Sequence, residues 1–147
     1  MRNPHELTQF MIERHNQHIA MKKDLYTAVI PGNLLFAPNK FDAKSNLQNL
    51  KPIKVTDLHF GVQKGKYLLL KSVCESTKNN CVSTVGLDSN GVGMRIGIYN
   101  LAEDVIPLGT NIIIKEPFYK EANDCLPVIR VDNPSDCIFF AEMLFRN

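Results

Sequence analysis

Residues 82–101 read VSTVGLDSNGVGMRIGIYNL, and this stretch decides the fold class. Residues 81–87, which overlap its beginning, alternate between two faces, which is the period of two typical of a half-buried strand. Asn90-Gly91 then interrupts the pattern, and this pair favours a tight hairpin because glycine readily takes a positive φ. Residues 93–101 alternate again. The stretch therefore predicts a β-hairpin.

Other segments extend this hairpin to a mainly β fold. The further segments that read as strands are residues 66–73, 110–116, 127–132 and, more briefly, 137–140. Between the third and fourth strands, residues 102–109 are expected to form one turn of helix across a barrel mouth. Five short strands with such a connector are the layout of an OB-like five-stranded barrel, although a small open sandwich would give a similar pattern. Gly86, Gly93 and Gly97 would permit the bends that barrel closure requires.

A helix and an extended linker are expected to precede the barrel. Asn3 caps a helix over residues 4–23, Pro4 suits its first position and Glu6 completes a capping box. The face expected to dock is formed by Leu7, Phe10, Met11 and Arg14. Residues 31–56 are rich in Pro, Asn and Lys and read as an extended connection.

These segments give three expected parts: an N-terminal helix over residues 1–24, an extended linker over residues 25–54 and the OB-like β-barrel domain over residues 55–147. The apolar ending, residues 139–146, favours a fragment of a longer chain.

Composition and charge narrow the class of protein. The chain has 17 basic and 15 acidic residues, which gives a net charge of +2. This charge is too small to indicate an anionic partner bound by overall electrostatic attraction. No apolar run approaches the roughly 20 residues that span a bilayer. We therefore expect no membrane partner and a cytoplasmic and/or nuclear location.

The titratable residues do not form a motif for covalent chemistry. The four cysteines form no CxxC pair, so we expect buried or half-buried thiols, no metal and no cofactor. His15 and His18 could offer two metal ligands but are better explained as solvated side chains on a helix. Asp132 and Asp136 flank a Pro-containing turn and are better explained as turn residues than as an acid/base pair.

Basic and aromatic residues are interleaved on the predicted strands. The candidate binding residues are Lys64, Lys66, Arg95, Tyr99, Lys115, Phe118, Tyr119, Lys120 and Arg130. OB-type barrels hold single strands by stacking bases on aromatic rings beside a cationic groove. The competing interpretation is that Tyr99 and Phe118 pack in the core while the lysines keep the surface soluble.

Four blocks of the sequence resemble a known family. They are residues 61–72 (GVQKGKYLLLKS), 85–101 (VGLDSNGVGMRIGIYNL), 108–120 (LGTNIIIKEPFYK) and 129–139 (IRVDNPSDCIF). In this order they resemble the N-terminal region of eukaryotic SET-domain proteins with tetratricopeptide repeats. The resemblance implies a region that precedes the repeats and the methyltransferase domain. The Asn-His pair and Gly-rich loop of a SET domain are not found in this sequence, so no catalytic residue is carried over.

Three functions remain open. The first is a non-catalytic accessory or interaction domain of a SET/tetratricopeptide lysine methyltransferase, with a protein or other domains of a larger chain as partner. The second is an OB-type module that binds single-stranded nucleic acid. The third is an enzyme whose Cys–His site is assembled only in space, which would require a thiol of low pKa.

Overall fold

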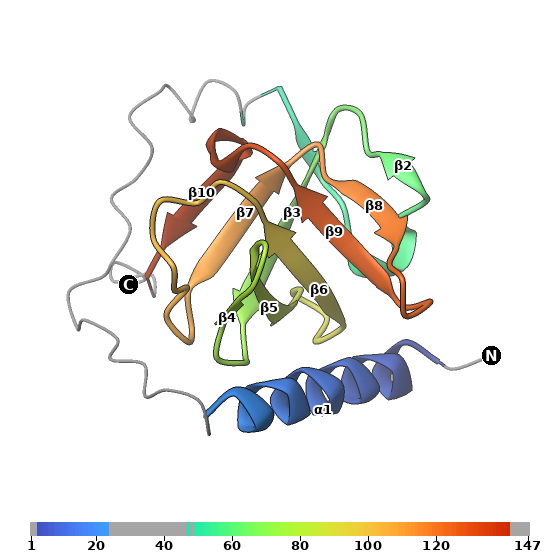
Figure 1. The fold of residues 1–147 in the computed structure, drawn as a ribbon. Helices are drawn as coiled ribbons and strands as arrows, with labels where there is room; N and C mark the ends of the chain where they lie inside the picture. The colour runs from blue at the N-terminus through green and yellow to red at the C-terminus, as the bar shows by residue number, and fades with distance from the viewer. Residues whose placement is uncertain (1–2, 24–46, 48, 142–147) are drawn as a thin grey trace, which may run out of the picture.

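The structure is a computed structural model that describes residues 3–23, 47 and 49–141. One helix, α1 (Pro4–Lys23), lies beside a sheet that is folded into a barrel-like body, with α1 below the sheet in the view of Figure 1. Much of the expected linker over residues 25–54 lies outside the described residues. Within it, Lys51 and Pro52 form β1, which pairs with β3.

The described residues form a ten-stranded sheet with the hydrogen-bonded order β10-β7-β3-β5-β6-β9-β8-β2; β1 pairs with β3, and β4 with β5. The strands are β1 (Lys51–Pro52), β2 (Gly61–Val62), β3 (Lys66–Ser72), β4 (Thr77–Lys78), β5 (Val82–Leu87), β6 (Gly93–Ile98), β7 (Asn111–Lys115), β8 (Phe118–Glu121), β9 (Pro127–Val131) and β10 (Cys137–Phe140). Two 3-10 turns, η1 (Val55–Asp57) and η2 (Pro134–Asp136), complete the elements. The mainly β fold is thus confirmed.

The predicted hairpin is the centre of the sheet. β5 and β6 pair antiparallel from Val82↔Ile98 to Leu87↔Gly93. At the turn, Gly91 has φ +78°, and the buried Asp88 carboxylate accepts from the backbone N–H of Asn90 at 2.9 Å. The same carboxylate accepts from Val92 N at 3.0 Å and from Val55 N at 2.9 Å. One side chain therefore fixes the turn and joins it to η1.

The sheet is open, which corrects the expected closed barrel. β7 pairs with β3, whereas β8, only two residues later in the chain, pairs with β9. Between them Glu116 has φ +47° and Pro117 has no N–H to donate, so the strand hydrogen bonding is interrupted here. Pro117 does end the predicted fourth strand, but the chain resumes as β8, which the sequence analysis missed.

The connector over residues 102–109 forms bends and turns and no helix, so the expected helical turn is wrong. Its backbone groups bond to other segments instead. Ile106 N donates to Ser76 Oγ at 2.8 Å, and Gly109 N donates to Ser72 O at 3.0 Å. Pro107 supplies no N–H and its carbonyl accepts from Thr110 N at 3.1 Å. These bonds give backbone N–H and C=O groups of the connector hydrogen-bond partners, so the connector does not need the internal hydrogen bonds of a helix.

Alternate residues of the strands build the core inside the sheet. Leu68, Leu70, Ile96, Ile98, Ile112 and Ile114 are at most 1% exposed. Burial of each such side chain contributes about 1.5–3 kcal/mol. The outward residues between them remain available for surfaces, because successive side chains of a strand point to opposite faces.

The capping box of α1 is confirmed. Glu6 N donates to Asn3 Oδ1 at 2.8 Å, and Asn3 N donates to Glu6 Oε1 at 3.4 Å. The docked face, however, differs from the expected one: Thr8, Met11 and His15 are buried, whereas Arg14 is exposed. Polar residues take part in docking because they bond to the body, and apolar periodicity does not reveal them.

Thr8 holds the first half of α1 against β6. Its Oγ1 accepts from Gly93 N at 2.6 Å and donates to Pro4 O at 2.8 Å. A Cβ at position 93 would lie only 2.6 Å from Thr8 Cγ2. The glycine therefore serves a close approach of helix and strand rather than the strand bend that the sequence suggested.

A second contact ties α1 to the turn between β8 and β9. The Arg95 guanidinium binds both carboxylate oxygens of Asp124, at 2.8 and 2.9 Å, and Arg14 Nε reaches the same carboxylate at 3.1 Å. Arg95 also donates to the carbonyls of Leu126 and Pro127. The carboxylate of Asp124 in this turn thus connects the turn to both α1 and β6.

Gly93→Ala is expected to lower the free energy of unfolding by about 1–3 kcal/mol, because the added methyl group forces α1 away from β6. Thr8→Ser removes the opposing methyl group but keeps the hydroxyl, so the double variant should recover part of this loss. Urea denaturation followed by circular dichroism measures the effect, with Thr8→Ser alone as the control. A double variant no more stable than Gly93→Ala would contradict this account.

Asp124→Asn is expected to cost about 1–3 kcal/mol at neutral pH, because Arg95 loses its charged partner. Partial burial by itself raises the pKa of Asp124, but the hydrogen bonds from Arg95 and Leu126 N and the charges of Arg95 and Arg14 bring the pKa below its ordinary value. The carboxylate's contribution is therefore complete above the unfolded pKa of about 3.9 and is lost as the pH falls through the lower folded pKa.

The stability gap between the parent chain and Asp124→Asn should accordingly narrow below about pH 4 in denaturation curves recorded across pH. Asp104→Asn is the matched control, since its carboxylate pairs with Lys78 but is 71% exposed, and it should change stability by less than about 0.5 kcal/mol. A gap that is constant from pH 7 to pH 2 would exclude the ion pair as its source.

Candidate functional site

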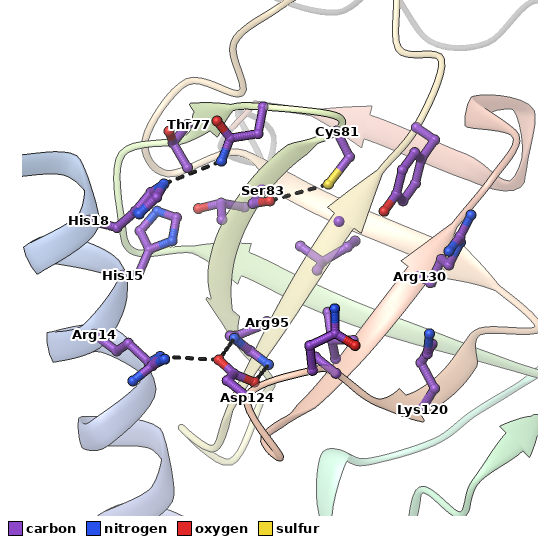
Figure 2. Close-up of a pocket in the computed structure, with 18 of the residues that line it drawn as sticks. Arg14, His15, His18, Thr77, Cys81, Ser83, Arg95, Lys120, Asp124 and Arg130 are labelled. Atoms are coloured by element: carbon purple, nitrogen blue, oxygen red, sulfur yellow. Dashed lines mark hydrogen bonds and ion pairs between the residues drawn. The ribbon is translucent and has the colours of Figure 1, made fainter. Parts of the chain in front are cut away.

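A groove of about 610 Å³ lies between α1 and the outer face of the sheet. β5, β6, β9 and the segment around β8 supply its floor and far wall, and α1 supplies the near wall. Figure 2 shows Arg14, His15 and His18 entering from the helix, with Arg95, Lys120 and Arg130 across from them. We call this hollow the helix groove.

Strand register explains which residues form the floor. Ser83 on β5 pairs with Gly97 on β6, which pairs with Arg130 on β9. Gly97 is the only one of these without a side chain, and a Cβ there would lie 3.1 Å from Cys81 Sγ. The glycine therefore keeps the middle of the floor low between taller side chains.

At one end of the groove, an arginine contacts both an aromatic ring and a carboxylate. The Arg130 guanidinium carbon lies 4.3 Å from the centre of the Tyr99 ring, and Arg130 Nε donates to Asp132 Oδ1 at 2.7 Å. The hydrogen bond to Asp132 raises the pKa of Arg130, which stays charged. Stacking on the ring also holds the guanidinium in one plane.

The groove carries more cationic than anionic groups. Asp124 is the one carboxylate among the described residues that line it, and Arg95 and Arg14 already bind it. Lys120 and Arg130 add positive charge on the far side. An anionic or strongly polar ligand therefore fits the groove better than an apolar one.

The helix wall corrects the expectation of a solvated side chain for His15 and confirms it for His18. His15 is only 9% exposed, and its Nε2 lies 2.6 Å from the Glu75 carbonyl. A carbonyl oxygen only accepts, so this nitrogen carries a proton, and burial lowers the pKa of His15 so that the ring is neutral at pH 7. His18 is exposed and accepts from Asn79 Nδ2 at 3.3 Å.

The structure brings together four of the nine candidate binding residues. Arg95, Tyr99, Lys120 and Arg130 line the helix groove. Neither Tyr99 nor Phe118 is buried in the core, and Phe118 is 39% exposed. Lys115, Phe118 and Arg130 line a second groove near the Glu116–Pro117 break.

The remaining three candidates lie outside both grooves. Lys64 is exposed in the turn before β3, and Lys66 begins β3 beside β1. Tyr119 stacks on Phe60, with ring centres 5.0 Å apart, and packs partly against the core, which raises the pKa of its hydroxyl.

The four cysteines all lie in the described part of the chain and are free thiols. The described residues include no group of three or more His, Cys, Asp or Glu that could hold a metal. Burial raises the pKa of Cys74 to about 11 and that of Cys137 to about 12, so both stay as thiols at neutral pH. Cys125 is exposed, which corrects the expectation that all four thiols are at least half-buried.

The turn interpretation of residues 132–136 is confirmed. Asn133 Oδ1 accepts from Ser135 N at 3.1 Å, and Pro134 begins η2. Asp132 is directed to Arg130, so it does not form a pair with Asp136 for proton transfer.

Several groove residues were not recognised in the sequence. Asp124, Ser83 and Cys81 line the groove, as do the helix residues Arg14, Gln17 and His18. A carboxylate in the Asn123-Asp124 turn gives no local signal, because its partners lie 29 and 110 residues away. For Ser83, the alternation of residues 81–87 placed it on the strand face opposite that of Val82, without indicating which face is outer.

Among the described residues, no helix is both long and apolar enough to cross a membrane.

A protein of Gibberella zeae (strain ATCC MYA-4620 / CBS 123657 / FGSC 9075 / NRRL 31084 / PH-1), described as "Methyltransferase", is 28% identical over 62% of this chain. The match spans 14% of that relative's length. A solved structure described as "Molecular basis for abrogation of activation of pro-inflammatory cytokines" has 10% identity and a TM-score of 0.43, covering 76% of this chain and 53% of the other.

The strand order places β7 and β8 in different arms of the sheet. β3, β5 and β6 form a meander, β6 pairs in parallel with β9, and the split strand β7–β8 joins β3 to β9. In sequence, residues 49–139, more than half of the chain, match the family described as "Tetratricopeptide repeat protein 5 OB fold domain". The chain therefore belongs to the family of tetratricopeptide repeat protein 5 OB fold domains.

Proposed function

We propose that this chain is a non-catalytic accessory domain that binds its ligand in the helix groove. The observation that carries the proposal is the fixed arrangement of cationic side chains around the low floor at Gly97. Asp124 holds Arg95 in place, and Tyr99 and Asp132 hold Arg130. Side chains that are already fixed lose little conformational entropy when a ligand binds.

The same proposal includes the kind of protein that the domain serves. The four sequence blocks resemble the N-terminal region of SET-domain proteins with tetratricopeptide repeats, and a relative over 62% of the chain is described as a methyltransferase. We infer that the larger enzyme methylates protein lysines in the cytoplasm or nucleus and that this domain contributes binding and no chemistry. The raised pKa values of Cys74 and Cys137 support this division, because neither thiol is a ready nucleophile.

A second candidate function is binding of single-stranded nucleic acid in the same groove. Its specific support is the presence of Tyr99 beside Arg130 and Lys120. Aromatic rings beside cations hold bases and phosphates of single strands. In this case Arg130 and Lys120 would face phosphates, and Tyr99 would face a base.

A photoreactive phenylalanine derivative in place of Ser83 is expected to form covalent adducts with the natural ligand in cells that express the full-length protein. Ser83 lines the groove and is partly exposed. The matched control carries the derivative in place of Ser135, which is exposed on η2. Protease and nuclease digestion of the adducts then distinguishes a protein ligand from a nucleic acid. Identical adducts from both positions would show that the groove is not the binding site.

For nucleic acid, Tyr99→Ala and Lys120→Gln are each expected to weaken binding of a labelled 15-nucleotide single strand about tenfold in fluorescence anisotropy. Lys120→Gln should also reduce the salt dependence of binding by about one phosphate contact. Lys115→Ala is the control, because Lys115 lies outside the helix groove. Flat anisotropy at low salt, or an equal loss with Lys115→Ala, would exclude this candidate.

A further inference from the structure

Three cationic residues surround one position in the floor of the helix groove. That position is Val128 on β9, which is partly exposed, and Arg130 is the next outward residue of the same strand, about 6.6 Å along it. Lys120 on β8 pairs directly with Val128, and the parallel register of β6 and β9 places Arg95 on its other side. Because neighbouring strands are about 5 Å apart, the three cations are grouped around Val128 (Figure 2).

The ion pairs of the groove leave positive charge unbalanced. Arg14 and Arg95 share the single carboxylate of Asp124, so that carboxylate balances only one of the two guanidinium charges. Lys120 has no ion pair with any residue that the structure describes. Two positive charges therefore remain after the pairing within the groove is counted.

Arg130 keeps hydrogen-bond donors for a ligand although it has a partner. Asp132 accepts from its Nε, and Tyr99 covers one face of its guanidinium. The two terminal NH2 groups make no hydrogen bond to the described residues, and the side chain is 40% exposed. These NH2 groups form a fork that can bind two oxygens of one anion. The contacts with Asp132 and Tyr99 thus fix the fork while leaving it able to donate.

The grouped charges favour one dianionic group over a chain of single charges. A phosphorylated Ser or Thr side chain carries a charge of about −1.5 to −2 at pH 7 and three acceptor oxygens. A nucleic-acid strand instead presents its phosphates in a line and needs aromatic faces for its bases. Tyr99 is the one Phe, Tyr or Trp among the described lining residues, and Arg130 already covers one face of its ring.

We propose that the ligand of the helix groove is a phosphorylated protein segment, whose phosphoserine or phosphothreonine binds over Val128 between Lys120 and Arg130. This inference rests on the proposed function, because it names the class of ligand for the same groove. Lys120 and the Arg130 fork bind the phosphoryl oxygens. Arg95 adds positive charge from a position that Asp124 fixes.

The probe is a mixture of labelled 11-residue peptides with a central phosphoserine and varied flanking residues, and fluorescence anisotropy on the whole chain is the measurement. The phosphorylated mixture is expected to bind at least about tenfold more tightly than matched mixtures with serine or glutamate at the centre. Equal binding of the three mixtures, or no binding of the phosphorylated one, would overturn the proposal. So would tighter binding of a 15-nucleotide single strand, since a nucleic acid would then be the ligand.

Variants test the two residues that bind the phosphoryl group. Lys120→Gln and Arg130→Gln are each expected to weaken binding of the phosphorylated mixture about tenfold. Arg130→Lys keeps the charge but not the fork, so it should recover only part of this loss. Lys64→Gln is the matched control, because Lys64 is exposed outside both grooves and its loss should leave affinity unchanged. A loss with Lys64→Gln equal to that with Lys120→Gln would refute the site.

Crosslinking from position 83 separates failure of this inference from failure of the proposed function. In extracts of cells that express the full-length protein with the photoreactive derivative in place of Ser83, phosphatase treatment before irradiation should abolish the protein adducts. Adducts that persist would refute recognition of a phosphoryl group but leave the groove as the binding site. Identical adducts from Ser83 and from the control position Ser135 would refute both.

Discussion

The buried carboxylate of Asp88 holds the centre of the structure. It accepts three backbone N–H groups, two within the β5–β6 turn and one from Val55 in η1. β5 and β6 occupy the middle of the strand order, and both the α1 contact and the floor of the helix groove are built on them. A displaced turn would therefore shift Gly93 against Thr8 and Gly97 against Arg130 at the same time.

Helix docking then turns a plain sheet face into a groove. α1 covers only part of the outer surface of β5 and β6, where Thr8, Met11 and His15 are buried. The rest of that surface stays open beside Arg14 and His18. Because polar contacts supply much of this docking, the helix can place charged groups along the groove edge without a broad apolar stripe.

Local patterns predicted much of the fold and less of the site. Alternation and Asn90-Gly91 predicted the central hairpin, and Asn3 with Glu6 predicted the helix start, since each depends on residues within one turn. β8 was missed because Pro117 was taken as the end of the strand, although the chain resumes one residue later on a different neighbour. Four candidate binding residues share the helix groove, but Lys115 falls elsewhere, because which arm of the sheet a strand joins is decided by pairing between distant segments.

The interruption at Glu116–Pro117 has a mechanical consequence. β7 belongs to one arm of the sheet and β8 to the other, and across this point the arms are joined by the covalent chain rather than by a strand ladder. Backbone hydrogen bonds still link both sides of this point to one segment, since Glu116 N donates to Lys66 O at 2.8 Å and Pro117 O accepts from Gln63 N at 3.0 Å. The short segment between β2 and β3 therefore links the two arms, because β2 pairs with β8 and β3 pairs with β7.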